Sequence, residues 1–395
     1  MHVTIVGGGI GGLALAHGLI RAGISADVYE RTHQRSDWLQ GYRIHINPAG
    51  ARALRDCLPP QNWAKFLDTV SGGDGGFGFL TDQCTELLGL PASEINTEGE
   101  RHFAASRIHL RDVLLAGLED VVHHGREFTR YQADGDRVTA FFADGSTASA
   151  DLLVGADGAN SRVRAQLLPH AAGRLDTGEV AVAGKHPLAS LPEVLTARAN
   201  IVIPRGRGSL FTAAWQPLSA EPGYVLWGFA DAAGQFPADV SSLDGLALQA
   251  LVASRLAGWS PVFRRLIGDS DPATVNALQV KSAIPVEPWP TGRVTLLGDA
   301  IHNMTPMAGV GANTALRDAD LLRRRLAEGG PLLEAVAGYE REMLDYGFAA
   351  VRQSLRNAKR AASTSWAGRA GFRAMLRLTA VTPPLRRAMA RGLGD

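Results

Sequence analysis

The first thirty residues constrain the fold more than any other stretch of the chain. Residues 1–6 are a short β-branched run, a glycine cluster follows at 7–12, and residues 13–21 have an Ala/Leu-rich helical pattern. A second apolar run, residues 26–29, ends at Glu30. This order predicts a dinucleotide-binding βαβ unit, because it places a strand, the G-x-G-x-x-G turn, a helix, a second strand and an acid in succession. This stretch alone does not separate FAD from NAD(P).

Each part of the motif has a physical role. Gly7 permits the tight turn, Gly9 lets a pyrophosphate approach the backbone, and Gly12 lets the helix pack close to the strand. The helix N-terminus offers free N–H groups to phosphate, and Glu30 is placed to accept hydrogen bonds from ribose. The cofactor contacts expected here are Gly7, Gly9, Ile10, Gly11, Gly12, Glu30 and Arg31.

Composition limits the classes of function. The 395 residues can form two domains, and the net charge of +1 gives no indication of a nucleic-acid partner. Cys57 and Cys84 fit no metal spacing, so we expect no metal site. Neither an export signal nor a run of eighteen apolar residues is visible, so we expect a cytoplasmic protein without stable membrane insertion.

The distribution of strand-like and helical patterns predicts an α/β (α+β) fold. We expect a Rossmann-like cofactor-binding domain with a parallel sheet at 1–177 and 286–330, with a small inserted part near 71–105. A mostly antiparallel substrate domain should span 178–285, and helices should fill 331–395. Ten Lys/Arg and one acid lie between 352 and 395. That excess fits a membrane-surface or anionic-ligand face, but we favour a solvated outer face of interdomain helices.

Two further turns share a feature with the N-terminal motif: an apolar strand is followed by a glycine turn that carries an acid. Apolar runs end at Gly155-Ala156-Asp157-Gly158 and at Gly298-Asp299. Ligands of open parallel sheets sit beyond the carboxyl ends of strands, so the three turns should converge on one extended ligand. Asp299 can accept a hydrogen bond from a ribityl or ribose hydroxyl, can cap the helix that follows, or can do both.

The segment that follows favours a flavin. Gly309 and Gly311 would bring backbone close to a flat group, and a helix opening near Ala312 would point its positive end at that group. A flavin carries negative charge when it is reduced, whereas an oxidised nicotinamide is positive. FAD therefore fits this segment better than NAD.

These three motifs, in this order, resemble the class A FAD-dependent monooxygenases, the aromatic hydroxylases with the para-hydroxybenzoate hydroxylase fold. The matches are the first glycine motif with Glu30, then Asp157-Gly158 with Ser161 and Arg164. The third comprises Gly298-Asp299, His302, Pro306, Gly309, Gly311, Asn313 and Asp318. Residues 105–111 and 304–313 look most like the tetracycline-inactivating members. By this resemblance Arg107 contacts FAD. Val310 and Ile301 depart from the residues usual in the family.

The resemblance implies a mechanism. NAD(P)H, more often NADPH, would reduce FAD, and the reduced flavin would form a C4a-hydroperoxide with O2. One oxygen atom would then enter an aromatic or polycyclic small molecule, and we expect hydroxylation of a polyketide or an antibiotic-like compound. We expect a monomer or a homodimer. Arg35 is a candidate NAD(P)H contact.

Candidates for contacts with substrate come from two regions. His45, Arg43 and His302 are the polar residues expected near the flavin, and a histidine could act as a base near neutral pH. For each residue taken singly we favour the alternative role of satisfying backbone groups, so no catalytic base is assigned. Phe211, Trp215, Trp227 and Phe229 alternate along two strands, where they either line a pocket for a flat substrate or form sheet core.

Other activities remain open at this stage. The same fold could support epoxidation or Baeyer–Villiger insertion, and the basic C-terminus leaves a squalene-epoxidase-like or geranylgeranyl-reductase-like enzyme possible. A non-catalytic protein that sequesters a drug with the help of FAD is a further alternative. A flavin-dependent halogenase is disfavoured because its Trp-x-Trp signature is missing.

Overall fold

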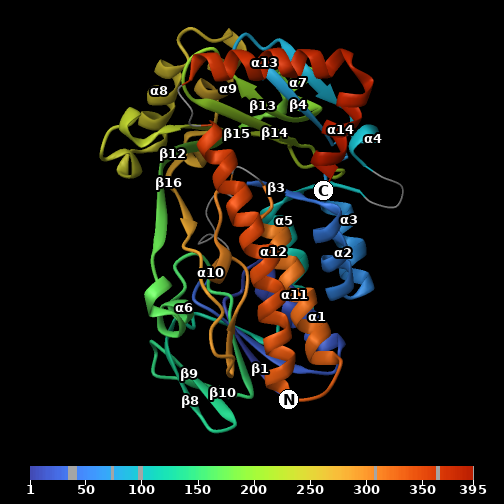
Figure 1. Cartoon of the computed structure of the whole chain (residues 1–395), viewed down its shortest axis with the longest axis vertical. Helices are drawn as coiled ribbons and strands as arrows, with labels where there is room; N and C mark the ends of the chain where they lie inside the picture. The colour runs from blue at the N-terminus through green and yellow to red at the C-terminus, as the bar shows by residue number, and fades with distance from the viewer. Residues whose placement is uncertain (34–41, 73–74, 97–100, 307–308, 362–364, 395) are drawn as a thin grey trace.

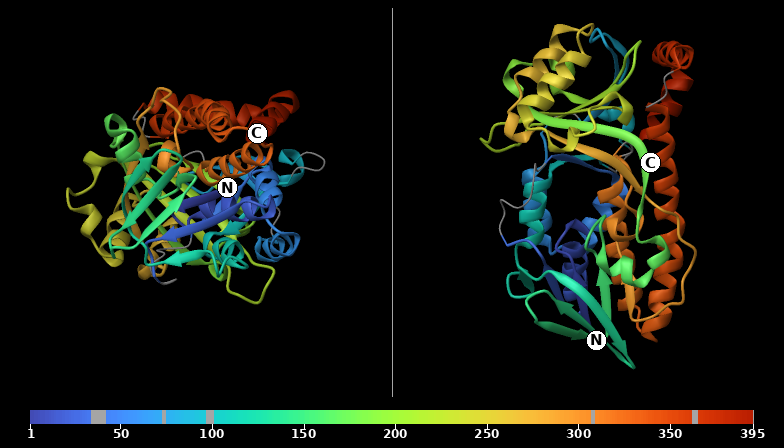
Figure 2. Two further views of the ribbon diagram at one scale, coloured as in Figure 1. Left: turned by 90° about the horizontal axis from the view of Figure 1, so that it is seen from below. Right: turned by 90° about the vertical axis from the view of Figure 1, so that its left-hand side faces the viewer.

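The computed structural model describes residues 1–33, 42–72, 75–96, 101–306, 309–361 and 365–394 (Figure 1). One part of the chain is built on a five-stranded sheet and another on a seven-stranded sheet, and long C-terminal helices run along one side of both (Figure 2). The expected mixed α/β fold is therefore confirmed. Arg35 lies outside the described residues.

The five-stranded sheet is parallel, with the order β17-β11-β1-β2-β7. Its strands are β1 (His2–Val6), β2 (Ser25–Glu30), β7 (Val122–His124), β11 (Leu152–Gly155) and β17 (Val294–Leu296). Most of their side chains are buried, as expected for parallel strands covered on both faces. Since β1, β11 and β17 are neighbours, the turns that follow them lie side by side at one edge of the sheet.

Helices cover the five-stranded sheet and pack on one another. Helices α1 (Ile10–Arg21) and α11 (Gly311–Ala327) pack on each other, and the long α12 (Leu332–Ala361) packs on α11. Asn47 caps α2 (Pro48–Cys57) by accepting from the Gly50 N–H, as the Asn-Pro start predicts. The remaining helices of this part are α3 (Pro60–Thr69), α5 (Arg107–Leu115), α6 (Arg162–Leu167) and α10 (Asp299–His302).

Smaller strands complete the first part. An antiparallel sheet has the order β10-β9-β8, from β8 (Phe128–Asp134), β9 (Arg137–Phe142) and β10 (Thr147–Ala150). Residues 122–134 form two strands, β7 and β8, and not one continuous strand. Gly125 adopts a φ of +72° there, so the chain turns from β7 into β8. Strand β3 (Arg43–Ile46) pairs with β6 (Phe103–Ser106).

The seven-stranded sheet has the order β16-β12-β15-β14-β13-β4-β5. Its strands are β4 (Gly76–Thr81), β5 (Glu86–Leu90), β12 (Arg174–Pro187), β13 (Arg198–Ile203), β14 (Ser209–Trp215), β15 (Tyr224–Ala232) and β16 (Asn276–Ala283). All pairs are antiparallel except β13 with β4. The strands of the expected insert near 71–105 therefore extend this second sheet.

The two faces of the seven-stranded sheet have different neighbours. Trp227 and Phe229 point to the outer face, where they are buried with side chains of α8 (Gly245–Arg255) and α9 (Pro261–Gly268). The inner face looks toward the first part of the chain. Near β4 and β5 it is covered by α13 (Trp366–Val381), with α14 (Pro383–Gly394) and α4 (Ala92–Ile95) beside it. The short α7 (Glu193–Thr196) contacts β14 and β13.

The break between α13 and α14 falls at Thr382, directly before Pro383-Pro384, as the sequence predicts. In the part of the chain that the structure describes, no helix combines the length and the apolar character needed to cross a bilayer.

Trp227→Ala should behave as a core truncation. Trp227 has no exposed surface, and its Nε1 donates to Ser270 Oγ at 2.7 Å. We expect a loss of about 3–5 kcal/mol in the free energy of unfolding, measured by urea denaturation. Phe211→Ala, on the inner face of the same sheet, is the control and should cost less. Equal losses would contradict the assignment of the two faces.

Candidate cofactor and substrate site

Close packing around the first glycine turn leaves no room for larger residues at Gly7, Gly11 and Gly12. Gly7 adopts a φ of +112°, and a Cβ there would lie 2.3 Å from the Ala156 carbonyl oxygen. A Cβ on Gly12 would lie 2.1 Å from the Gly7 oxygen, and one on Gly11 would lie 2.4 Å from Leu297. The first turn therefore packs directly against the turns after β11 and β17. A Cβ on Gly9 would meet nothing within 4 Å, so that side of the turn is open.

Two helix N-termini at this site are available to an anion. Helix α1 begins after Gly9 and α11 begins after Val310. Among the described residues no side chain caps either helix, and neither has an acid in its first turn. The free N–H groups and the helix dipoles therefore favour negative charge at both ends.

Glu30 is held as an ionised acceptor beside the turn. Its Oε2 accepts from the Gly8 N–H at 2.7 Å, and its Oε1 accepts from the N–H and hydroxyl of Thr32. Burial alone would raise the pKa of Glu30, but these hydrogen bonds and the nearby Arg111 outweigh it and lower the pKa. Arg31, the next residue, is exposed.

The two other acids have different surroundings. Asp157 accepts from Ser161 Oγ at 2.5 Å and from the Arg162 N–H at 2.8 Å, at the start of α6. Its carboxylate is therefore occupied in shaping the second turn. Asp299 is exposed, and among the described residues its carboxylate has no hydrogen-bond partner. A Cβ on Gly311 would lie 3.9 Å from its Oδ1, so Asp299 stands beside the start of α11.

The segment before α11 is shaped by glycine and by Asn313. Pro306 and Gly309 are exposed, Gly309 has a φ of +65°, and Ala312 is half-buried in the first turn of α11. Asn313 accepts from the Asn47 N–H at 2.9 Å and donates to the His45 carbonyl oxygen at 2.9 Å. Asn313 thus joins α11 to β3 and positions backbone rather than presenting its amide to a ligand.

Two of the candidate bases have environments that do not suit the role. His302 is fully buried, and its Nε2 lies 2.7 Å from Asp318 Oδ2. Burial alone would lower the pKa of His302, but Asp318 outweighs it and raises the pKa. The same Oδ2 accepts from the Gly298 N–H, so the pair positions the third turn. His45 stacks on His102, and burial, Arg43 and His102 lower its pKa to about 3.

Of the four aromatic candidates, only Phe211 and Trp215 lie on the inner face. Phe211 pairs with Gly228, which places Phe211 on the face opposite to Trp227 and Phe229. Trp227 and Phe229 belong to the outer core, so we correct their assignment as substrate contacts. Phe211 is half-buried, whereas Trp215 is held between His109 and Tyr224 and donates to the Thr69 carbonyl oxygen.

Sequence reasoning missed a polar group at the junction of the two parts. Arg43 Nε donates to the Ala214 carbonyl oxygen at 3.1 Å, so this candidate does reach the sheet. Tyr42 donates to the Ala183 and Thr274 carbonyl oxygens, and Lys185 Nζ lies 4.7 Å from the ring centre of Tyr224. No local motif marks these residues, because they come from three distant strands or loops.

Arg107 occupies the start of α5, where its N–H donates to the Tyr42 carbonyl oxygen at 3.3 Å and its side chain is exposed. Its predicted contact with cofactor remains a prediction.

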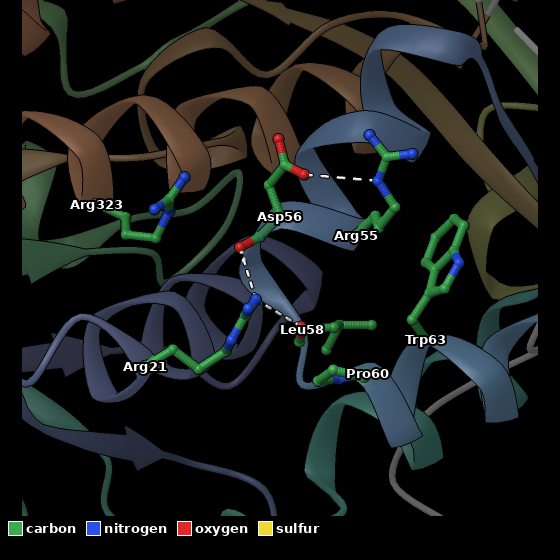
Figure 3. Close-up of a pocket in the computed structure, with 7 residues that line it drawn as sticks. All are labelled: Arg21, Arg55, Asp56, Leu58, Pro60, Trp63 and Arg323. Carbon is green, nitrogen blue, oxygen red and sulfur yellow. Dashed lines mark hydrogen bonds and ion pairs between the residues drawn. The ribbon is translucent and has the colours of Figure 1, made fainter. Parts of the chain in front are cut away.

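A surface hollow of about 530 Å³ lies away from this site (Figure 3). Its lining residues are Arg21, Arg55, Asp56, Leu58, Pro60, Trp63 and Arg323. Arg21 ends α1, about 18 Å along the helix from Gly9. Arg21 already donates to the Asp56 and Leu58 carbonyl oxygens, and Arg323 pairs with Asp320. None of the glycine-turn residues lines this hollow.

The fold and these turns define a dinucleotide-binding flavoprotein of the oxidoreductase type. Residues 96–331 match the family model described as an FAD binding domain, and residues 5–69 match an NAD(P)-binding Rossmann-like domain. The chain belongs to the FAD-dependent monooxygenases and is an enzyme of that family.

Individual relatives agree with this assignment. An FAD-dependent urate hydroxylase from Klebsiella pneumoniae is 31% identical, over 87% of this chain and 86% of the relative. A dual O-methyltransferase/FAD-dependent monooxygenase from Phaeosphaeria nodorum is 32% identical over 81% of this chain, which spans only 39% of that relative. A solved FAD-containing monooxygenase from Photorhabdus luminescens is 37% identical, with a TM-score of 0.83 over 91% of this chain and 98% of its own. A tetracycline destructase, at 17% identity and a TM-score of 0.66, is similar in fold alone.

The site fits FAD on its own geometry. The open side of Gly9 and the free end of α1 suit the pyrophosphate, Glu30 suits the ribose, and Asp299 with the end of α11 suits the flavin end. When bound, FAD supplies the redox chemistry and the activation of O2. The protein supplies binding, orientation and exclusion of water.

Asp299→Ala should weaken FAD binding more than Asp157→Ala. Losing a hydrogen bond to a charged group costs about 1.5–3 kcal/mol, or about ten- to a hundred-fold in Kd. The carboxylate of Asp157 already accepts hydrogen bonds from Ser161 and Arg162. Its loss should therefore destabilise the start of α6 and lower the stability of the protein. Flavin fluorescence titration of both variants decides between these effects, and equal affinities would contradict the placement of Asp299.

Acid should destabilise the protein partly through His45. Its pKa is about 3 in the folded protein and near 6.5 ordinarily, so between these values the unfolded chain binds more protons. Stability is therefore lost as pH falls through this window. Urea unfolding at about pH 7.5 and about pH 5 should show a smaller acid-induced loss for His45→Gln. The same loss in both proteins would refute a His45 that is neutral in the folded protein.

Proposed function

We propose that the enzyme uses NAD(P)H, and NADPH in preference to NADH, to reduce its FAD. We propose that it then hydroxylates an acidic aromatic small molecule with one oxygen atom of O2. A polyketide or antibiotic-like phenol is the substrate type we favour. The membership in the FAD-dependent monooxygenases supports the reaction type. The polar group formed by Arg43, Lys185, Tyr42 and Tyr224 supports the substrate class.

The observation that carries the substrate class is a pair of cations at the junction that have no ion-pair partner among the described residues. Burial lowers the pKa of Arg43 to about 10, so Arg43 remains positively charged at neutral pH. Burial also lowers the pKa of Lys185, and Asp271 opposes this only in part. Among the described residues neither cation makes a salt bridge. Both side chains are half-buried. A partly desolvated cation without a described counter-ion is costly, so an anionic oxygen of a ligand would be stabilised there.

The inner face of the sheet supplies an apolar wall next to these cations. Phe211 and Gly228 pair directly, and Leu226, two residues from Gly228, pairs with Lys185. The ring of a substrate can lie along this wall while its ionised oxygen faces Arg43 and Lys185. Holding the phenolate form increases electron density on the ring. It also removes the need for a nearby base, which fits the low pKa of His45.

A screen of reductant consumption tests the activity. Oxidation of NADPH and of NADH should accelerate with phenolic polycyclic compounds, and mass spectrometry should find a product with one added oxygen atom. The absence of any oxygenated product across phenols, enols and their methyl ethers would contradict the proposal. Methyl ethers cannot ionise, so we expect them to be poor substrates.

Arg43→Gln and Lys185→Gln should raise KM for a phenolic substrate by about ten- to a hundred-fold, because each removes a charged hydrogen-bond donor. The Kd for FAD should change little. Lys281→Gln, on the neighbouring strand β16, is the matched control and should leave KM unchanged. Equal KM values for methyl ether and phenol in all variants would refute recognition of the anion.

A further inference from the structure

Exposed apolar side chains are concentrated on the C-terminal helices. Trp366 and Val381 are each 77% exposed and Leu378 is 56% exposed, although all three are in or at the start of regular helix. Ala367, Ala370 and Ala374 are exposed on the same helix. We name this the C-terminal apolar surface; its large members are Trp366, Phe372, Met375, Leu378, Val381 and Leu385.

The helices that carry this surface are attached to the sheet, so the exposure is a feature of the folded chain. Arg373 donates to the Ile203 carbonyl oxygen and lies 3.4 Å from Asp82. Arg369 donates to the Gly208 carbonyl oxygen, and Arg386 makes two bonds to Glu94. Figures 1 and 2 show α13 and α14 on the outside of the molecule, at the end that carries the seven-stranded sheet.

Among the described residues, the charged side chains of α13 and α14 are all basic. Residues 365–394 contain no Asp or Glu. Arg377, Arg387 and Arg391 are exposed, and no acid pairs with them among the described residues. Arg387 and Arg391 are one helical turn apart and line a hollow of about 560 Å³ with Glu94, Pro384 and Ala390. Glu94 is already bonded to Arg386, so the hollow suits an anionic headgroup.

We propose that the C-terminal apolar surface docks on an anionic lipid bilayer, with α13 lying in the interface. Exposed Trp, aliphatic and arginine side chains on one helical surface are the features that hold a helix at such an interface. Arginines near the surface attract anionic headgroups. A symmetric second copy of this chain is the poorer occupant, because the same uncompensated arginines would face one another.

Docking in this way would place lipid beside the apolar wall that the inner face of the seven-stranded sheet supplies. The ring centre of Phe372 on α13 lies 6.1 Å from that of Phe79. Phe79 pairs with Ile201, and Ile201 pairs with Phe211, so these residues form one row on the inner face. The row runs from α13 to Phe211. An apolar substrate dissolved in lipid would thus reach the enzyme at the α13 end of this row.

Vesicle co-sedimentation of the FAD-loaded protein tests the proposal. The vesicles are phosphatidylcholine alone, or phosphatidylcholine with about one third phosphatidylglycerol. We expect binding at least about tenfold tighter to the anionic vesicles, weakened by salt. Leu378→Asp/Val381→Asp should weaken binding about tenfold or more. Arg377→Gln/Arg387→Gln/Arg391→Gln should weaken it by about fivefold per arginine.

Leu246→Asp is the matched control, because Leu246 is 65% exposed on α8. It should bind vesicles like the unaltered protein, and the flavin spectrum of every variant should be unchanged. Equal binding to both kinds of vesicle, or to neither, would overturn the proposal. So would a lipid-free dimer that Leu378→Asp/Val381→Asp converts to monomer, because a second copy would then cover the surface.

Discussion

Close backbone packing between the turns after β1, β11 and β17 is the constraint on which the site depends. Gly7 and Gly12 allow the first turn to meet Ala156, and Gly11 allows α1 to meet Leu297 and Ala315. These contacts hold the N-termini of α1 and α11 at one edge of the parallel sheet, with neither helix capped by a described side chain. The protein thereby builds an anion site from backbone alone, which requires little rearrangement when a dinucleotide binds.

The polar residues around these turns divide into two groups by burial. Glu30, Asp157 and Asp318 are bonded within the protein and shape the backbone; Asp318 also accepts from Tyr346 at 2.6 Å. Asp299 is exposed and has no described partner. The first group holds the backbone of the turns in place, and the carboxylate of Asp299 is available for the ligand contact that we predict.

Local features could be predicted from the sequence, whereas contacts between distant segments could not. The glycine–acid turns, the start of α11 and the cap of α2 each depend on a few adjacent residues. The faces of β14 and β15 depend on register, because a shift of one residue exchanges the faces, and the pairing of Phe211 with Gly228 placed Trp227 and Phe229 in the core. The buried state of His302 depends on Asp318, and Lys185 meets Tyr42 only across the junction. No pattern along the chain reports such contacts.

Titration of the folded apoprotein with FAD, for the unaltered chain and for Gly9→Asp, tests the central claim most directly. A Cβ at Gly9 would meet nothing within 4 Å and the φ of Gly9 is −79°, so Gly9→Asp should fold normally. The carboxylate of the introduced aspartate would occupy the space in which we expect the pyrophosphate to bind. We expect one FAD per unaltered chain, released on denaturation, and a folded but colourless Gly9→Asp protein. Equal FAD affinity in the two proteins would contradict a cofactor site built on the free end of α1.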